Sequence, residues 1–231
     1  MSDVIKSRYE ILKQRIKVAC QKVHRHESEV HLLAVSKGQS VGAIAELYHL
    51  GQRDFGENYV DELLSKKKEL QEECPDIVWH FIGQIQTNKA KKIATVDFVH
   101  SVSSEKQALV LSKYCSKENL LAVLLQVSFR EDIHRGGVSP SSLRQLCHQI
   151  KAIKELELKG LMLILPLEME KNPALGFQCV AEIKKTIEKQ DNLLLPELSM
   201  GMSNDFEEAI AYGATWVRIG SALFGTRNKI K

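Results

Sequence analysis

Lys37 stands at the end of an apolar segment, residues 30–38 (VHLLAVSKG). A near-continuous apolar run that ends at a glycine is typical of a strand buried on both faces, as in parallel sheets. Because side chains alternate along a strand, Leu33, Val35 and Lys37 are expected to share one face. Inside a barrel the ammonium would be desolvated and its pKa lowered, and a neutral lysine is a nucleophile toward carbonyl groups. The alternative is a lysine that caps the strand end and extends into water.

Glycine and serine residues follow the last two strand-like segments of the chain, Gly201 with Ser203 and Gly220 with Ser221. In α/β barrels the loops after strands seven and eight commonly bind phosphate, because unpaired backbone N–H groups and helix dipoles favour an anion there. These residues would supply flexible backbone and hydroxyl donors at such loops. The alternative is that they form only turns and helix caps.

Arg218 lies between Val217 and Ile219 in a segment that is expected to be a buried strand. A permanently charged guanidinium needs an acceptor there, and an Asp or Glu partner in the core is one alternative. An inward lysine, a phosphate site and this arginine together suit pyridoxal 5'-phosphate (PLP). The aldehyde would then meet Lys37, the phosphate the last two loops, and the pyridine nitrogen Arg218.

Eight strand-like segments alternate with helical ones and would position these side chains. We predict strands at residues 30–37, 53–56, 77–82, 97–101, 120–127, 158–165, 197–200 and 216–219. Helix starts are predicted at Ser40, Thr87, Ser104, Ser139-Pro140 and Asn172-Pro173. Residues 3–26 carry apolar side chains at steps of four and three, which predicts a long amphipathic helix before the first strand.

This pattern predicts that residues 1–231 form one domain, a single-domain (β/α)8 TIM barrel with an extra N-terminal helix. A doubly wound open sheet is the competing architecture. In such barrels functional groups lie at the carboxyl ends of the strands. That rule selects Glu57 and Gly83 together with seven candidate site residues, Lys37, Asn58, His80, Ser203, Arg218, Gly220 and Ser221.

The composition excludes several classes of protein. The 32 basic and 29 acidic residues give a net charge of only +3, which does not indicate a nucleic-acid or membrane surface. The lysine runs at 66–68 and 89–92 are interpreted as solvated helix faces, and His24 and His26 likewise, so no metal site is expected.

The five cysteines are scattered and never form a C-x-x-C pair, which favours reduced thiols over a disulfide scaffold or zinc site. The chain shows neither a signal-peptide core nor an uncharged run of membrane-spanning length. We therefore expect a soluble cytoplasmic protein without membrane partners.

Five segments carry a resemblance that extends over nearly the whole chain: residues 33–37 (LAVSK), 55–59 (FGENY), 79–83 (WHFIG), 198–203 (LSMGMS) and 217–221 (VRIGS). In this order they strongly resemble the PLP homeostasis proteins, single-domain relatives of the N-terminal barrel of alanine racemase. The resemblance implies a Schiff base on Lys37, phosphate contacts from Ser203, Gly220 and Ser221, and Arg218 at the ring nitrogen. It also makes Asn58 and His80 candidate cofactor contacts.

Three positions depart from the family pattern. Gln39 and Arg135 stand where the family often has lysines, which puts in doubt accessory roles such as relay of PLP to a second site. Ser221 stands where threonine is more frequent and keeps the hydroxyl. The primary site is expected to be unaffected.

The sequence favours a non-catalytic PLP-binding protein over an enzyme. An arginine at the pyridine nitrogen disfavours ring protonation, which makes the ring a poorer electron sink. Racemases of this fold take a second base, a tyrosine, from an additional domain that we do not find in this sequence. We expect a role in PLP, vitamin B6 and amino-acid homeostasis, a monomer, and PLP-dependent apo-enzymes as candidate partners. The alternatives are a weak PLP-dependent amino-acid racemase that uses Lys37 as its base and a cofactor-free lysine aldolase.

Overall fold

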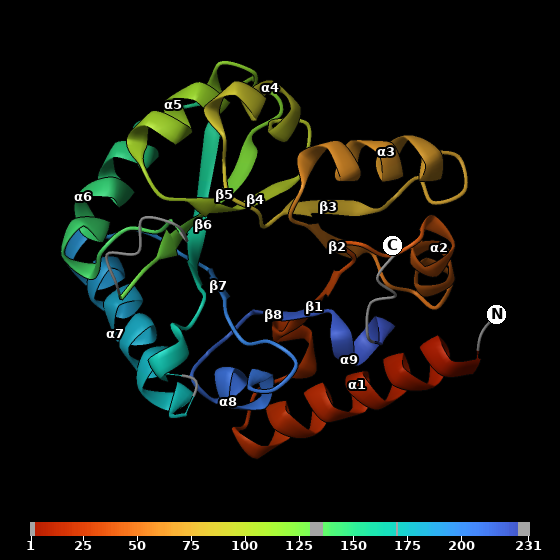
Figure 1. Ribbon diagram of the computed structural model, residues 1–231. Coiled ribbons are helices and arrows are strands. Elements are labelled where there is room, and N and C mark those ends of the chain that lie inside the picture. Colours follow the sequence, from red (N-terminus) through yellow and green to blue (C-terminus); the bar gives the residue numbers. More distant parts are fainter. Residues whose placement is uncertain (1–2, 130–135, 170, 226–231) are drawn as a thin grey trace.

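Eight short apolar segments form parallel strands that close into a barrel (Figure 1). The computed structural model describes residues 3–129, 136–169 and 171–225. Each strand pairs with the next along the chain, and β8 closes the barrel against β1 in a register that sets Leu33 opposite Arg218. The strands are β1 His31–Val35, β2 Asp54–Glu57, β3 Val78–Phe81, β4 Phe98–Val102, β5 Leu121–Val127, β6 Leu156–Leu163, β7 Glu197–Ser199 and β8 Trp216–Ile219. The predicted (β/α)8 barrel is confirmed, and the open sheet is excluded.

Two strands differ from their predicted bounds, and the difference at β1 concerns the site. Strand β1 ends at Val35, so Lys37 lies in the turn that follows and not on the strand. Strand β6 begins at Leu156, two residues before the predicted start, and pairs there with Leu121. Its first residues alternate between buried leucines and the more exposed Glu157 and Lys159. Because this part of the strand is exposed on one face, it lacks the continuous apolar run from which the strand was predicted.

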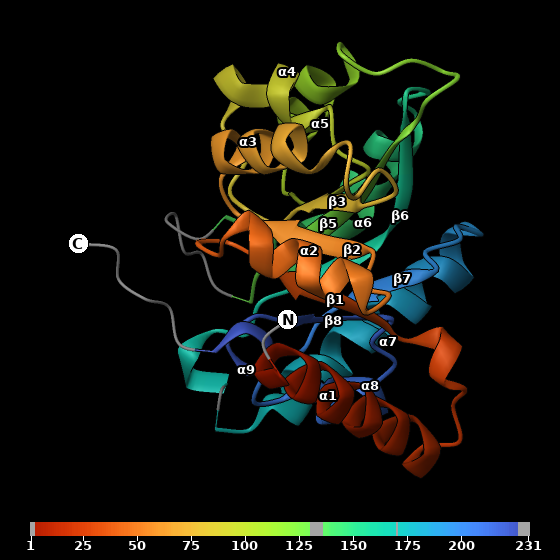
Figure 2. The same cartoon turned by 90° about the vertical axis from the view of Figure 1, so that its right-hand side faces the viewer.

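The helices form a ring outside the strands (Figures 1 and 2). They are α1 Asp3–Lys22, α2 Val41–His49, α3 Val60–Leu70, α4 Ala90–Ile93, α5 Glu105–Ser112, α6 Pro140–Lys151, α7 Pro173–Asp191, α8 Phe206–Ala211 and α9 Ser221–Phe224. Helix α1 packs against α8, α9 and α2, between the first and last parts of the barrel. The predicted extra N-terminal helix therefore lies in the outer layer, beside α8, α9 and α2.

Local capping explains where several helices begin. The hydroxyls of Ser40 and Ser104 accept the backbone N–H groups of Ala43 and Gln107, so both predicted caps are confirmed. Ser139 and Asn172 precede helices with proline in the first turn, but neither side chain forms a capping hydrogen bond. The cap predicted at Thr87 is wrong, since Thr87 lies inside a short 3-10 helix that begins after Gln86.

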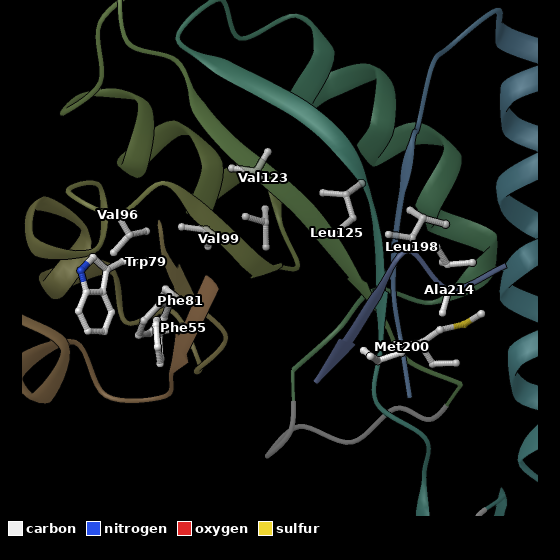
Figure 3. Packing of buried hydrophobic residues seen from close by; sticks show 14 of the residues in the cluster. Phe55, Trp79, Phe81, Val96, Val99, Val123, Leu125, Leu198, Met200 and Ala214 are labelled. Atoms are coloured by element: carbon white, nitrogen blue, oxygen red, sulfur yellow. The ribbon is translucent and has the colours of Figure 1, made fainter. Parts of the chain in front are cut away.

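Two cores of different character lie on the two sides of the strands. The layer between strands and helices is apolar, and Figure 3 shows Phe55, Trp79 and Phe81 close together in it. The barrel interior differs, because it also holds buried polar side chains, among them His80, His100, Ser199 and Arg218. His100 on β4 bonds to Ser199 on β7 at 3.0 Å, and because these strands are not neighbours the bond crosses the interior. Barrels of this type usually fill that space with branched apolar side chains.

Candidate functional site

A cavity of about 530 Å³ opens at the carboxyl ends of the strands. Its lining comes from residues in or after β1, β2, β3, β6, β7 and β8, which is where functional groups of such barrels lie. The residues that line it are Val35, Lys37, Gln39, Asn58, Ile82, Met162, Ile164, Pro173, Met202, Ser203, Asn204, Asp205, Arg218, Gly220, Ser221 and Gly225. Six of the seven predicted site residues are among them.

The turn that carries Lys37 is held on both sides by a buried ion cluster. Ser36 Oγ donates to Glu57 Oε1 at 2.6 Å, and the Gly38 N–H donates to Glu62 Oε1 at 2.6 Å. Lys66 Nζ joins the two carboxylates at 2.8 and 2.6 Å and also donates to the Ser36 carbonyl at 2.8 Å. The residues before and after Lys37 are thus anchored, which fixes the backbone from which the lysine side chain extends.

This cluster corrects the interpretation of the lysine run at 66–68. Lys66 is buried and not part of a solvated face, because its ammonium is needed to compensate the carboxylate of Glu57, which is fully buried. Burial raises the pKa of Glu57, while hydrogen bonds from Lys66 and Ser36 oppose that effect. Only Lys66 among the three lysines faces inward, as helical periodicity requires.

The loops after β7 and β8 bring two hydroxyls together, Ser203 Oγ and Ser221 Oγ, at 3.3 Å. Gly201 allows the first loop to form, because its φ of +89° is strained for other residues and a Cβ there would collide with Phe206. Asp205 Oδ1 then accepts the N–H of Met202 at 2.6 Å and holds the loop closed. The pair of serines therefore belongs to a preformed loop arrangement, not to two separate turns.

Arg218 lies beneath the cavity, 5% exposed, with neutral acceptors. Its Nη1 donates to Ser199 Oγ at 3.0 Å, and its Nη2 donates to the carbonyl oxygen of Leu163 at 2.8 Å. Burial lowers the pKa of Arg218 to about 10, and the charge of Asp205 opposes this shift. These bonds use two of five guanidinium N–H groups, so the side chain has further donors for an acceptor in the cavity.

Asn58 faces the cavity with a buried side-chain oxygen that has no hydrogen-bond partner among the described residues. Its position depends on Gly83, since a Cβ at that glycine would overlap the carbonyl oxygen of Asn58. A buried amide without a partner carries a desolvation cost that a bound polar ligand would relieve.

His80 lies elsewhere. It is fully buried inside the barrel, bonded to His100 at 2.9 Å and to Asp54 at 3.1 Å, and it is not among the residues that line the cavity. Ile82, two residues further along, takes the place on the cavity wall that the sequence suggested for His80. Gln39 lines the cavity, whereas Arg135 falls outside the described residues.

The sequence profile of the alanine racemase N-terminal domain matches residues 9–228. The "Pyridoxal phosphate homeostasis protein" of Pseudomonas aeruginosa is 43% identical over 217 residues, which cover 93% of this chain and 92% of the relative. The protein of the same name from Schizosaccharomyces pombe is 42% identical over 206 residues, 86% of this chain and 84% of the relative. This chain belongs to the pyridoxal phosphate homeostasis protein family.

Solved structures agree with this family membership. PipY of Synechococcus elongatus, in a structure with PLP bound, superposes with a TM-score of 0.80 at 36% identity and covers 92% of this chain and 99% of its own. An alanine racemase from Clostridium difficile superposes with a TM-score of 0.74 at 12% identity, and 58% of that chain is covered. At that identity the racemase shows the common fold alone.

Two residues that shape the site were not singled out by sequence reasoning. Ser199 supplies an acceptor for Arg218, and Lys66 anchors the Lys37 turn together with Glu57, which the strand-end rule had selected. For Ser199 the available signal was alternation along β7, which sets it on the face opposite Leu198. For Lys66 it was helical periodicity, since Lys66 lies three residues after Leu63 and four before Leu70 on the buried face of α3.

Proposed function

We propose that this protein holds PLP in the cavity at the carboxyl ends of the strands, as a Schiff base on Lys37. The observation that carries the proposal is that Lys37, the Ser203 and Ser221 pair and Arg218 line one cavity. Bound there, the cofactor supplies an aldehyde, with which a lysine amine forms a C=N bond and releases one water. The homologue solved with PLP bound supports the choice of cofactor.

The residues present fit this cofactor in three respects. The Ser203 and Ser221 hydroxyls, with the backbone at Gly220, suit an anionic phosphate. The guanidinium of Arg218 has further N–H groups that can donate to the pyridine nitrogen, which is an acceptor when it is unprotonated. The unpartnered amide of Asn58 suits a polar substituent of the ring.

We infer that the protein binds and buffers PLP without catalysing a reaction, and thereby serves PLP and amino-acid homeostasis. Among the described residues that line the cavity, the charged ones are Lys37, Asp205 and Arg218, and the lining contains neither tyrosine nor histidine. Asp205 is occupied by the Met202 N–H. The cavity therefore offers little for the second acid or base that racemisation requires.

The absorbance spectrum of the purified protein tests the proposal. We expect a visible band on addition of PLP that borohydride abolishes and that Lys37→Ala does not form, whereas the exposed-site control Lys68→Ala retains it. Turnover of an amino acid at an ordinary enzymatic rate, lost in Lys37→Ala, would favour the racemase alternative. A wild-type protein that remains colourless with excess PLP would refute the proposal.

The phosphate assignment has a test of its own. Replacing Ser221 by alanine removes a hydroxyl from the phosphate contact, so we expect the affinity for PLP to fall about 2- to 10-fold, the range of one hydrogen bond. The affinity for pyridoxal, which lacks the phosphate, should not change. An equal loss for both ligands would contradict the assignment of the phosphate to this loop.

We propose that the protein acts as a cytoplasmic monomer whose PLP is available to apo-enzymes. No described helix has the length and apolarity needed to cross a bilayer. Within the described part of the chain, no cluster of three or more metal-ligating side chains is found.

A further inference from the structure

A continuous chain of hydrogen bonds crosses the polar interior of the barrel. Asp54 Oδ1 and His80 Nε2 are 3.1 Å apart, and His80 Nδ1 lies 2.9 Å from His100 Nε2. His100 Nδ1 lies 3.0 Å from Ser199 Oγ, which in turn accepts from Arg218 Nη1 at 3.0 Å. Four contacts therefore join Asp54, at the amino end of its strand, to Arg218 under the cofactor cavity.

The chemistry of its two ends fixes the direction of every bond. A guanidinium only donates, so Ser199 Oγ accepts from Arg218 and has its one hydrogen available for His100 Nδ1. A carboxylate only accepts, so His80 Nε2 donates to Asp54. A neutral imidazole has one donor and one acceptor, so His100 Nε2 donates to His80 Nδ1. The Asp54 end therefore requires the Nε2–H form of both neutral histidines, and the Arg218 end is compatible with it, because the hydroxyl of Ser199 can accept from Arg218 while donating to His100.

The surroundings favour neutral histidines. His80 and His100 have no exposed surface, and burial lowers the pKa of His80 and takes that of His100 well below its ordinary value. The rings of Phe98 and Trp216 enclose them, with the His80 and Phe98 centroids 4.6 Å apart and stacked. Because the rings are enclosed, neither imidazole can flip about its Cβ–Cγ bond without disturbing this packing.

We propose that Asp54, His80 and His100 are positioning residues that hold the guanidinium of Arg218 in place from the opposite end of the barrel. Asp54 selects the Nε2–H form of both histidines, and that form leaves the Ser199 oxygen oriented to accept from Arg218. The Leu163 carbonyl is the second anchor. The effect on PLP binding rests on the proposed function, whereas the series of hydrogen bonds from Asp54 to Arg218 does not.

At its Asp54 end, the hydrogen-bond chain borders a second cavity. Asp54, whose side chain is 23% exposed, lines a cavity of about 480 Å³ at the amino ends of the strands, together with His31, Arg53 and part of α1. Arg218, at the other end, lines the cavity at the carboxyl ends of the strands. The hydrogen-bond chain thus connects the two ends of the barrel. A substitution of Asp54 alters the hold on Arg218, at the pyridine-nitrogen end of the proposed PLP site, without movement of the backbone.

Histidine tautomers measured by ¹H–¹⁵N NMR in ligand-free protein test the chain directly. The His80 and His100 signals are assigned by their absence in His80→Gln and His100→Gln. At pH 7 we expect both rings to be neutral with hydrogen on Nε2, and Asp54→Ala to give mixed tautomers at both. The surface control Asp61→Ala should leave the spectrum unchanged. A protonated or Nδ1–H form of either ring in the wild type would overturn the inference.

PLP binding by the same variants tests the positioning role. We expect Asp54→Ala, shown to be folded by its NMR spectrum, to bind PLP about 2- to 10-fold more weakly and with a shifted visible band, because one anchor of Arg218 is lost. Asp61→Ala should match the wild type. Unchanged affinity and spectrum in Asp54→Ala would overturn the positioning role, whereas a wild type that binds no PLP would refute the proposed function and leave the tautomer result standing.

Discussion

At the scale of single residues, the site depends on charged groups that are buried with specific partners. Glu57 and Lys66 compensate one another beside Lys37, and Arg218 is held by a hydroxyl and a carbonyl oxygen. Such groups are costly to bury, and removing one partner leaves the other uncompensated. We therefore expect single substitutions here to affect folding as well as binding.

The lysine run at 66–68 offers a matched pair for this expectation. Lys66→Met should lower the free energy of unfolding by about 3–5 kcal/mol, because Glu57 would remain buried without its cation. Lys68→Met, on the exposed face of the same helix, should change it by less than about 0.5 kcal/mol. Urea denaturation measures both. Equal effects of the two substitutions would show that the ion cluster does not anchor the Lys37 turn.

Sequence reasoning succeeded for residues at strand ends and was less informative for His80. Alternation along β8 fixes the face that Arg218 occupies, and closure of the barrel brings the carboxyl ends of the strands together, so that Lys37 and Ser203, in the segments after β1 and β7, line the same cavity. The height of a residue along the barrel axis depends on strand bounds and register, which one sequence does not give. A step of two residues, about 6.6 Å, separates His80 from Ile82 on the cavity wall.

At the scale of secondary-structure elements, helix α1 is the addition that completes the outer layer. Its amphipathic pattern was readable from the sequence, because Tyr9, Leu12 and Ile16 recur at helical spacing and all are buried. Exact helix ends and the cap at Thr87 were less predictable, since they depend on competition between neighbouring turns.

Adjacent residues of α1 test its role. Leu12 is 2% exposed and Ile11 is 57% exposed. Leu12→Ala should therefore cost about 2–5 kcal/mol of unfolding free energy by leaving a cavity against the barrel, whereas Ile11→Ala should cost less than about 0.5 kcal/mol. Chemical denaturation of the two variants gives the comparison. A small effect at Leu12 would mean that α1 contributes little to the fold.

At the scale of the whole molecule, a polar barrel interior makes stability depend on pH. Burial lowers the pKa of His80 and takes that of His100 well below its ordinary value in the folded protein, while the unfolded chain titrates near the ordinary histidine pKa of about 6.5. As the pH falls below that value, the unfolded state binds protons that the folded state does not, so the free energy of unfolding decreases. Glu57 has the opposite effect on the free energy of unfolding. Because its pKa is raised in the folded protein, the folded state takes up this proton at a higher pH than the unfolded state does.

A comparison with His100→Gln isolates the histidine contribution, because Glu57 is common to both proteins. Between pH 6 and pH 5 the wild type should lose about 1.4 kcal/mol per pH unit more than the variant, the equivalent of one proton. Urea unfolding at several pH values gives both slopes. Parallel slopes would mean that His100 is protonated in the folded state.

The central claim is that Lys37 holds PLP covalently at the upper mouth of the barrel. The most direct measurement is peptide mass spectrometry of PLP-saturated protein after borohydride reduction. We predict a phosphopyridoxyl group on the peptide that contains Lys37, in a yield that follows the loss of the visible band. An unmodified Lys37 in protein that has bound PLP to saturation would contradict the account.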